Sequence, residues 1–201
     1  RDYWERFWSE PRFAGGFIWE WVDHGIRCVS DDGAEYFAYG GDFGDEPNDG
    51  NFVIDGLVSP DREPSPAMAQ LKKMHEPVAV KPCDAARGVF QLTNRYDFST
   101  LEELEGTWRL VADGDILQSG RLALPELAPG AAAEIAVPFK LPSCPVRDYW
   151  VELSFTLARD QPWAPRGHEV AWAQALARTA VSQPAPATSA ALRVDETEAA
   201  Q

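Results

Sequence analysis

Residues 106–124, GTWRLVADGDILQSGRLAL, decide the fold of most of this chain. Apolar and polar residues alternate on both sides of the turn sequence Ala112-Asp113-Gly114-Asp115, and Asp-Gly is a favoured centre for a two-residue hairpin turn. The stretch therefore predicts two paired strands that bury one face. Similar short runs with period-two alternation follow or precede it at residues 88–98, 131–139, 148–158 and 168–177.

Short strands at this spacing predict an antiparallel β-sandwich of the immunoglobulin type over residues 79–182. The chain has no Cys–Trp–Cys arrangement, which excludes the antibody subtype. Val170, Trp172 and Gln174 alternate along the last run, and we expect Trp172 in the sandwich core or at a domain interface.

Residues 1–78 have a different, α/β pattern. Residues 1–9 have helical periodicity, and residues 17–19 form a short apolar run that predicts a buried strand. A long loop follows, and residues 66–75 predict a helix with Ser65 as its N-cap. This order is the repeat unit of a βα barrel, but one unit and a half cannot close a barrel.

The two ends of the sequence suggest a longer protein. Arg1 is not an initiator methionine, and RDYWERFW begins inside a helical pattern. Residues 183–201, rich in Pro, Ala and Thr, are typical of a linker towards a further domain.

Composition limits the partners of the chain. The formal net charge of −14 argues against nucleic acid and anionic membranes, which both require clustered Lys and Arg. No apolar run approaches the ~20 residues of a membrane span. The three cysteines, Cys28, Cys83 and Cys144, have no metal-ligand spacing and suit a reducing compartment, so we expect a cytoplasmic location.

The loop at residues 36–62, YFAYGGDFGDEPNDGNFVIDGLVSPDR, is the strongest functional signal. It is rich in acidic residues, glycine and aromatics and has no regular period, as expected of an ordered loop that positions functional groups. Asx side chains in such loops usually bond to nearby backbone N–H groups. We expect that scaffolding role for Asp42, Asp45, Asn48 and Asp49.

Three stretches closely resemble the large bacterial β-galactosidases of glycoside hydrolase family 2. They are GGFIWEWVDHG (15–25), the loop at 36–62, and GHEVAWAQ (167–174), so the resemblance covers most of the chain. It implies that residues 1–78 are the C-terminal end of a catalytic TIM barrel, with the last strand, the site loop and the closing helix. An immunoglobulin-like sandwich would follow.

The resemblance implies that this chain holds no catalytic residue. Retaining glycosidases use two carboxylates about 5–5.5 Å apart. In the family, both catalytic glutamates lie before the segment that matches residue 1. Glu20 would face the barrel helices if its strand neighbour Trp19 faces the sugar. A Ser/His/Asp hydrolase using His24 is disfavoured, because the chain has no G-x-S-x-G sequence.

Trp19 matches the family tryptophan that lines the galactose pocket. An indole suits the apolar C–H face of galactose. The alternative is an ordinary core tryptophan. By strand alternation Trp21 would face the same way as Trp19.

Phe52 and Asp55 match the loop that holds a sodium ion beside the sugar. The resemblance implies a backbone carbonyl ligand from Phe52 and a side-chain oxygen from Asp55, which suits a hard cation. The best-known member has Asn at the position of Asp55. A further aspartate ligand would lie upstream, as would the ligands of a possible Mg²⁺ in the parent enzyme. Alternatively, Asp55 caps the turn before Gly56.

The first reading is therefore part of a retaining β-galactosidase acting on terminal, lactose-type β-D-galactosides. The resemblance also implies that the parent enzyme is a homo-oligomer. A second reading is a non-catalytic carbohydrate-binding or adhesive β-sandwich module. A third, a relative acting on glucuronides or mannosides, is disfavoured by the GGDFGDEPNDGNF run.

Overall fold

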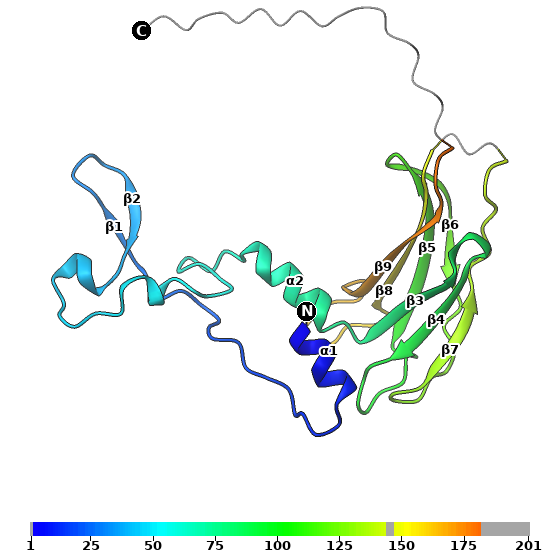
Figure 1. Cartoon of the computed structure of the whole chain (residues 1–201), viewed down its shortest axis with the longest axis horizontal. Coiled ribbons are helices and arrows are strands. Elements are labelled where there is room, and N and C mark those ends of the chain that lie inside the picture. The colour runs from blue at the N-terminus through cyan, green and yellow to red at the C-terminus, as the bar shows by residue number, and fades with distance from the viewer. Residues whose placement is uncertain (1, 144–146, 182–201) are drawn as a thin grey trace, which may run out of the picture.

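The computed structural model describes residues 2–143 and 147–181. Figure 1 shows an extended N-terminal part that leads into a β-sandwich, with helices α1 and α2 beside the sandwich and the hairpin β1–β2 far from it. The elements of the N-terminal part are α1 (Asp2–Ser9), β1 (Ile26–Val29), β2 (Glu35–Ala38), the 3-10 helices η1 (Gly40–Phe43) and η2 (Gly50–Val53), and α2 (Pro66–Met74).

The sandwich consists of two antiparallel sheets. One has three strands in the order β3-β4-β7, and the other has four in the order β6-β5-β8-β9. A short 3-10 helix, η3 (Ala85–Arg87), joins β3 to β4. The strands are β3 (Val78–Asp84), β4 (Val89–Asn94), β5 (Leu104–Ala112), β6 (Asp115–Leu122), β7 (Ala132–Ala136), β8 (Tyr149–Leu157) and β9 (Glu169–Arg178).

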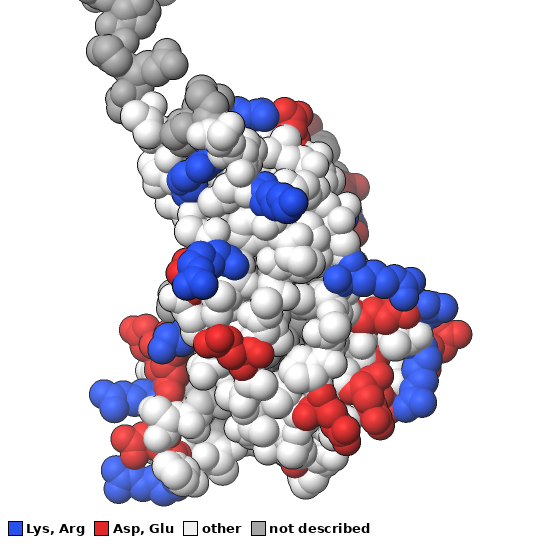
Figure 2. All heavy atoms as spheres, turned by 90° about the vertical axis from the view of Figure 1, so that its right-hand side faces the viewer, with Lys and Arg blue, Asp and Glu red and all other residues white. Residues whose placement is uncertain are grey.

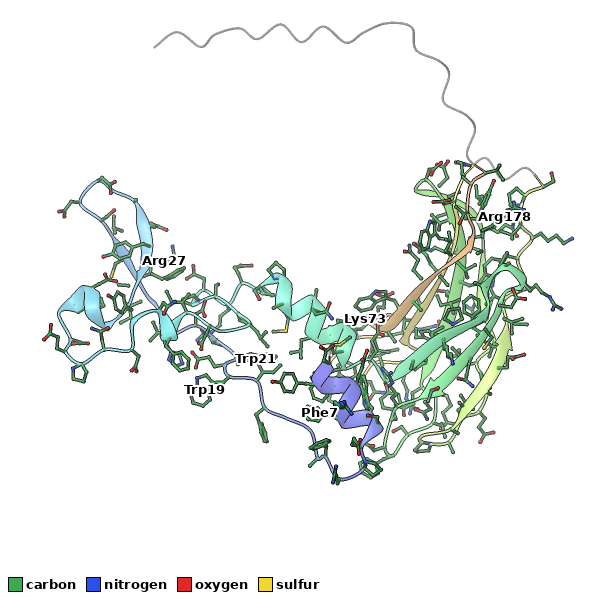
Figure 3. All side chains as sticks on the ribbon, in the orientation of Figure 1. Phe7, Trp19, Trp21, Arg27, Lys73 and Arg178 are labelled. Carbon is green, nitrogen blue, oxygen red and sulfur yellow. The ribbon has the colours of Figure 1, made fainter. Side chains whose placement is uncertain are left out.

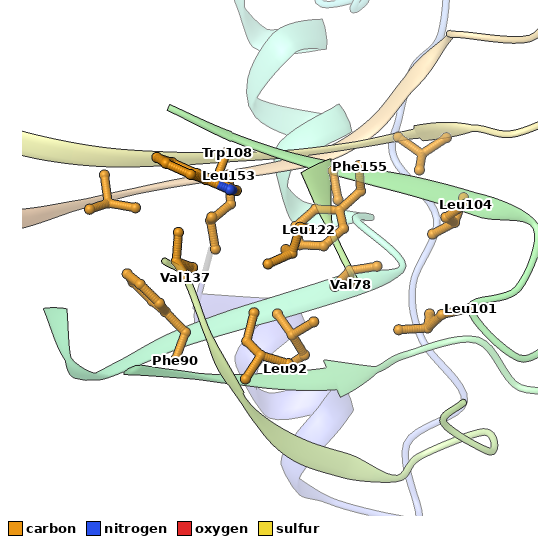
Figure 4. Packing of buried hydrophobic residues seen from close by; sticks show 14 of the residues in the cluster. Val78, Phe90, Leu92, Leu101, Leu104, Trp108, Leu122, Val137, Leu153 and Phe155 are labelled. Atoms are coloured by element: carbon orange, nitrogen blue, oxygen red, sulfur yellow. The ribbon is translucent and has the colours of Figure 1, made fainter. Parts of the chain in front are cut away.

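The core of the chain lies between these sheets. Every second residue of β8 from Tyr149 to Leu157 is buried, which is the alternation expected of a strand with one covered face. Figure 4 shows Phe155 and Leu153 of this sheet packed towards Phe90 and Leu92 of β4. The two-sheet architecture agrees with the sequence prediction, while its immunoglobulin-type assignment stays a prediction.

The hairpin turn at residues 112–115 is confirmed. Ala112 pairs with Asp115, and the two residues between them, Asp113 and Gly114, have φ values of 50° and 86°. Two successive positive φ values are what this tight turn requires, and Asp-Gly accepts them at low cost.

Strand β3 was missing from the predicted runs. Its sequence, VAVKPCD, contains Pro82, which normally argues against a strand. The structure accommodates it because β3 is at the edge of its sheet and, among the described strands, pairs only with β4. Proline has no N–H to donate, and on the side of an edge strand that has no partner strand this loss breaks no hydrogen bond of the sheet.

The predicted buried strand at residues 17–19 is wrong. No strand covers these residues, and Phe17 is fully exposed, with Ile18 and Trp19 exposed as well. A parallel barrel strand is normally paired on both sides. Here the segment makes one isolated parallel bridge, between Val22 and Val58. Without flanking strands among the described residues, the apolar run has no sheet to join.

Both predicted helices are confirmed. Ser65 is the N-cap residue of α2 and Pro66 is its first residue, although the Ser65 side chain makes no cap hydrogen bond. In the described part of the chain no helix is long and apolar enough to cross a membrane. Figure 2 shows basic and acidic side chains interspersed over one face of the sandwich.

Helix α2 is attached to the sandwich through a half-buried ion pair. Lys73 Nζ lies 2.7 Å from Glu76 Oε2, and Glu76 is only 5% exposed. Glu76 Oε1 accepts a hydrogen bond from the Trp172 N–H of β9 at 2.9 Å. Lys73 also donates to the Trp172 carbonyl and lies 4.6 Å from the centre of its ring. Trp172 is thus an interface residue, one of the two positions expected for it.

Candidate functional site

Two segments far apart in sequence form the candidate site. The backbone of residues 20–24 is hydrogen-bonded to that of residues 53–58: Leu57 N–H donates to the Glu20 carbonyl at 3.1 Å, and His24 N–H donates to the Val53 carbonyl at 2.9 Å. This pairing places the residue next to Trp19 against the loop that carries Phe52 and Asp55. The structure thereby brings the three predicted site residues into one region.

Gly56 makes this close pairing possible. Its N–H donates to Asp23 Oδ1 at 2.7 Å. A Cβ atom at Gly56 would lie 2.5 Å from the Asp23 backbone nitrogen and 2.7 Å from the Val22 carbonyl carbon. Contacts that short do not occur, so only glycine allows the segments to approach this closely. It is Asp23, not Asp55, whose carboxylate binds the Gly56 N–H.

The side chains predicted to meet ligands are open to solvent. Trp19 is 74% exposed, and Figure 3 shows it and Trp21 on the extended segment that leads away from α1. The ring of Phe52 and the side chain of Asp55 are also exposed. The core alternative for Trp19 is therefore excluded in this structure. Its contact with a sugar, and the cation contacts of Phe52 and Asp55, stay predictions.

The acidic loop has the expected scaffolding at Asp42 and Asn48, whereas Asp45 takes part through its backbone carbonyl and the Asp49 side chain makes no cap hydrogen bond to η2. Asp42 accepts a hydrogen bond from the Tyr39 N–H at 3.0 Å. The Asn48 amide donates to the Asp45 carbonyl at 2.9 Å and accepts from the Gly50 N–H at 3.0 Å. These bonds fix η1 and the start of η2, the 3-10 helix that contains Phe52.

The carboxylate nearest Trp19 is held within its own segment. Glu20 is paired with His24, whose Nε2 lies 2.8 Å from Glu20 Oε2, and the Glu20 side chain is only 14% exposed. Glu20, Asp23, His24 and Arg62 line a shallow groove of about 560 Å³. Over residues 2–143 and 147–181, no three His, Cys, Asp or Glu side chains gather into a metal site. The oxygens of Phe52 and Asp55 fit at most part of a cation's ligand shell.

One element beside this site was not predicted from the sequence. Strands β1 and β2 form a hairpin, with Ile26 paired to Ala38 and Val29 paired to Glu35. The signal was Ser30-Asp31-Asp32-Gly33, a turn sequence between two β-prone runs. Gly33 has a φ of 86°, as the turn requires.

Comparison with known families agrees with this two-part organisation. Residues 1–80 match the family described as "Glycosyl hydrolases family 2, TIM barrel domain". Residues 90–177 match the family described as "Beta-galactosidase, domain 4". A segment related to a glycosyl hydrolase TIM barrel domain is thus followed by a two-sheet module related to a β-galactosidase domain.

Curated relatives give the particular family. A β-galactosidase of Priestia megaterium is 36% identical over 199 residues, which are 98% of this chain and 19% of the relative. Those of Aeromonas hydrophila and Klebsiella pneumoniae are 35% and 36% identical over 94% of this chain and 18% of each relative. The chain belongs to the β-galactosidases of glycosyl hydrolase family 2. It spans about a fifth of the length of these relatives.

Proposed function

We propose that this chain supplies one wall of the sugar pocket in a retaining β-galactosidase that hydrolyses terminal β-D-galactosides. Trp19 stacks on the apolar face of galactose, and the Phe52 carbonyl and the Asp55 carboxylate are two of the oxygen ligands of a sodium ion. The catalytic glutamates belong to other parts of the parent enzyme. The observation that supports this proposal is the pairing of residues 20–24 with residues 53–58.

The carboxylates near Trp19 are already bound to other groups of the chain, which supports a non-catalytic role for them. Glu20 is bound to His24 and Asp23 is bound to the Gly56 N–H, so both carboxylates maintain the shape of the site. The bound cation supplies positive charge that orients substrate hydroxyls, and Asp55 adds a full negative charge to its ligand set. An aspartate at this position binds a cation more strongly than an asparagine would.

A chimera tests the proposal directly. The matching segment of the Priestia megaterium β-galactosidase is replaced by this chain, and hydrolysis of nitrophenyl β-galactoside is measured. We expect Trp19→Ala to lower kcat/KM by about tenfold to a hundredfold, the loss of one stacking contact. Asp55→Asn should raise the sodium concentration that gives half-maximal activity, whereas Asp49→Asn in the scaffold should not. A kcat/KM unchanged in Trp19→Ala would contradict the proposal.

The chain by itself should not turn over the substrate. Release of nitrophenol that disappears in Glu20→Gln or Asp23→Asn would place a catalytic carboxylate in this chain, contrary to the proposal. The same two substitutions distinguish enzyme chemistry from a contaminating activity, which neither would change.

A further inference from the structure

A second pocket, of about 650 Å³, lies where α1, the end of α2 and the sandwich meet. Trp4 and Trp8 of α1, Tyr96 and Phe98 after β4, and Trp163 before β9 contribute to its wall. None of its lining residues comes from residues 9–71, so it is separate from the site at Trp19. Its volume is that of a small-molecule site.

Trp8, Phe98 and Trp163 of this pocket are exposed, Trp4 and Tyr96 are half-buried, and each tryptophan has a polar partner. Trp163 is 63% exposed and lies edge-on to His168, with ring centres 5.7 Å apart. The Arg95 guanidinium lies 3.7 Å from the centre of the Trp8 ring, and His75 lies 4.2 Å from Trp4. Flat apolar faces therefore alternate with hydrogen-bonding groups around one cavity.

The charges of the pocket wall balance. Lys72 and Arg95 contribute two positive charges, and Glu76 and Asp97 contribute two negative ones. Burial lowers the pKa of His75, which favours its neutral form. A phosphate-bearing ligand would favour an excess of positive charge. The wall instead suits a neutral ligand with many hydroxyls and an apolar face, which describes a saccharide.

A neighbouring aromatic surface has a different chemistry. Tyr3, Phe7, Phe17, Ile18 and Met74 line a hollow of about 480 Å³ whose wall contains no Lys, Arg, Asp or Glu. Such a surface suits apolar protein side chains. If apolar protein side chains covered the pocket around Trp163, its charged and imidazole groups would lose their hydration at a cost in free energy. Sugar hydroxyls can instead form hydrogen bonds with these groups.

We propose that the pocket around Trp163 is a non-catalytic saccharide-binding site. Trp163 and Phe98 provide the stacking faces, and His168, Asp97 and Arg95 bond to hydroxyls. This site goes beyond the proposed function, because it uses neither Trp19 nor the cation ligands.

The experiment is a lactose titration of the ¹⁵N-labelled 201-residue chain, followed through the indole N–H signals. We expect the Trp163 signal to shift with a Kd of about 1 mM, typical of a small exposed sugar site, with no dependence on sodium. Trp163→Ala should raise the Kd at least tenfold. His168→Phe keeps an aromatic ring but loses its hydrogen bonds, and it should raise the Kd severalfold. The matched control, Phe43→Ala, removes an exposed aromatic ring that does not line this pocket, and it should leave the Kd unchanged.

The proposal is overturned if neither lactose nor cellotriose shifts the Trp163 signal, or if Trp163→Ala retains the wild-type Kd. Dimers seen by sedimentation that Trp163→Ala dissociates would show that a second copy covers the pocket, which also overturns it. Because Phe98 is 97% exposed, Phe98→Ala provides a second variant that leaves the fold intact, and it should weaken binding in the same direction.

Discussion

At the scale of single residues, Gly56 determines whether the two halves of the candidate site can meet. We predict that Gly56→Ala separates residues 20–24 from residues 53–58, because the new Cβ would collide with the Asp23 and Val22 backbone. The Val58 N–H, which donates to the Trp21 carbonyl at 3.0 Å, should then exchange with solvent at least tenfold faster. Amide hydrogen exchange measured by NMR provides the test.

Gly44→Ala is the matched control for this substitution. Gly44 has a φ of 79° but nothing lies within 4 Å of its would-be Cβ. It should show only the local strain of a left-handed residue, about 1 kcal/mol, and leave Val58 exchange unchanged. Equal effects of the two substitutions at Val58 would show that close approach is not what Gly56 provides.

Gly56 also shows what could not be predicted from the sequence. The roles predicted for Trp19, Phe52 and Asp55 came from matching motifs and stay predictions, while the structure shows residues 20–24 hydrogen-bonded to residues 53–58. The bond between Asp23 and the Gly56 N–H spans 33 residues and has no local signature. Turn chemistry near Gly56 pointed to Asp55 instead, because a sequence pattern registers neighbours along the chain and not across it.

At the scale of elements, Glu76 joins α2 to strand β9. Burial raises the pKa of Glu76 above its ordinary value of 4.5, and the hydrogen bonds from Lys73 and from the Trp172 N–H oppose that rise without cancelling it. The folded chain therefore holds this proton more tightly than the unfolded chain does. Its contribution to stability is fully present below pH 4.5 and is lost as pH rises through the raised pKa.

We predict that Glu76→Gln removes this component of the pH dependence. Gln retains an acceptor for the Trp172 N–H and should cost about 1 kcal/mol, whereas Glu76→Ala leaves that N–H without its acceptor and should cost about 2 kcal/mol. Urea unfolding of each variant between pH 4 and pH 8 gives the comparison. Glu134→Gln on the exposed side of β7 is the control. Parallel pH curves for wild type and Glu76→Gln would contradict the argument.

Some strands are predicted well from their sequences and others are not. The difference depends on whether the strand they pair with is close in the sequence. Strands β5 and β6 were predicted because their hydrophobic pattern is clear and they pair with each other across a two-residue turn. The run at residues 17–19 has a strand-like composition, yet a barrel strand forms only between neighbours. Strand β3 was the opposite case, since its pairing with β4 outweighed the unfavourable Pro82.

At the scale of the whole molecule, stability is concentrated in the sandwich. Strands β5 and β8 are central in their sheet and bury Leu110, Val151 and Phe155 completely. The hairpin β1–β2 is a separate two-stranded sheet, and such a hairpin is marginal in water. The N-terminal part and the sandwich are therefore expected to open independently, each with its own free energy.

Hydrogen exchange of the intact chain should resolve the two parts. We predict that amides of β5 and β8 exchange only through global unfolding, at least a thousandfold slower than those of β1 and β2, a difference of about 4 kcal/mol. Adding 1 mM galactose with sodium should not protect the hairpin, because the proposed site is only one wall of a pocket. Equal protection of β1 and β8 would mean that the chain folds as one cooperative unit. In that case the hairpin would draw its stability from the sandwich, across the pairing at Gly56 and the ion pair at Glu76.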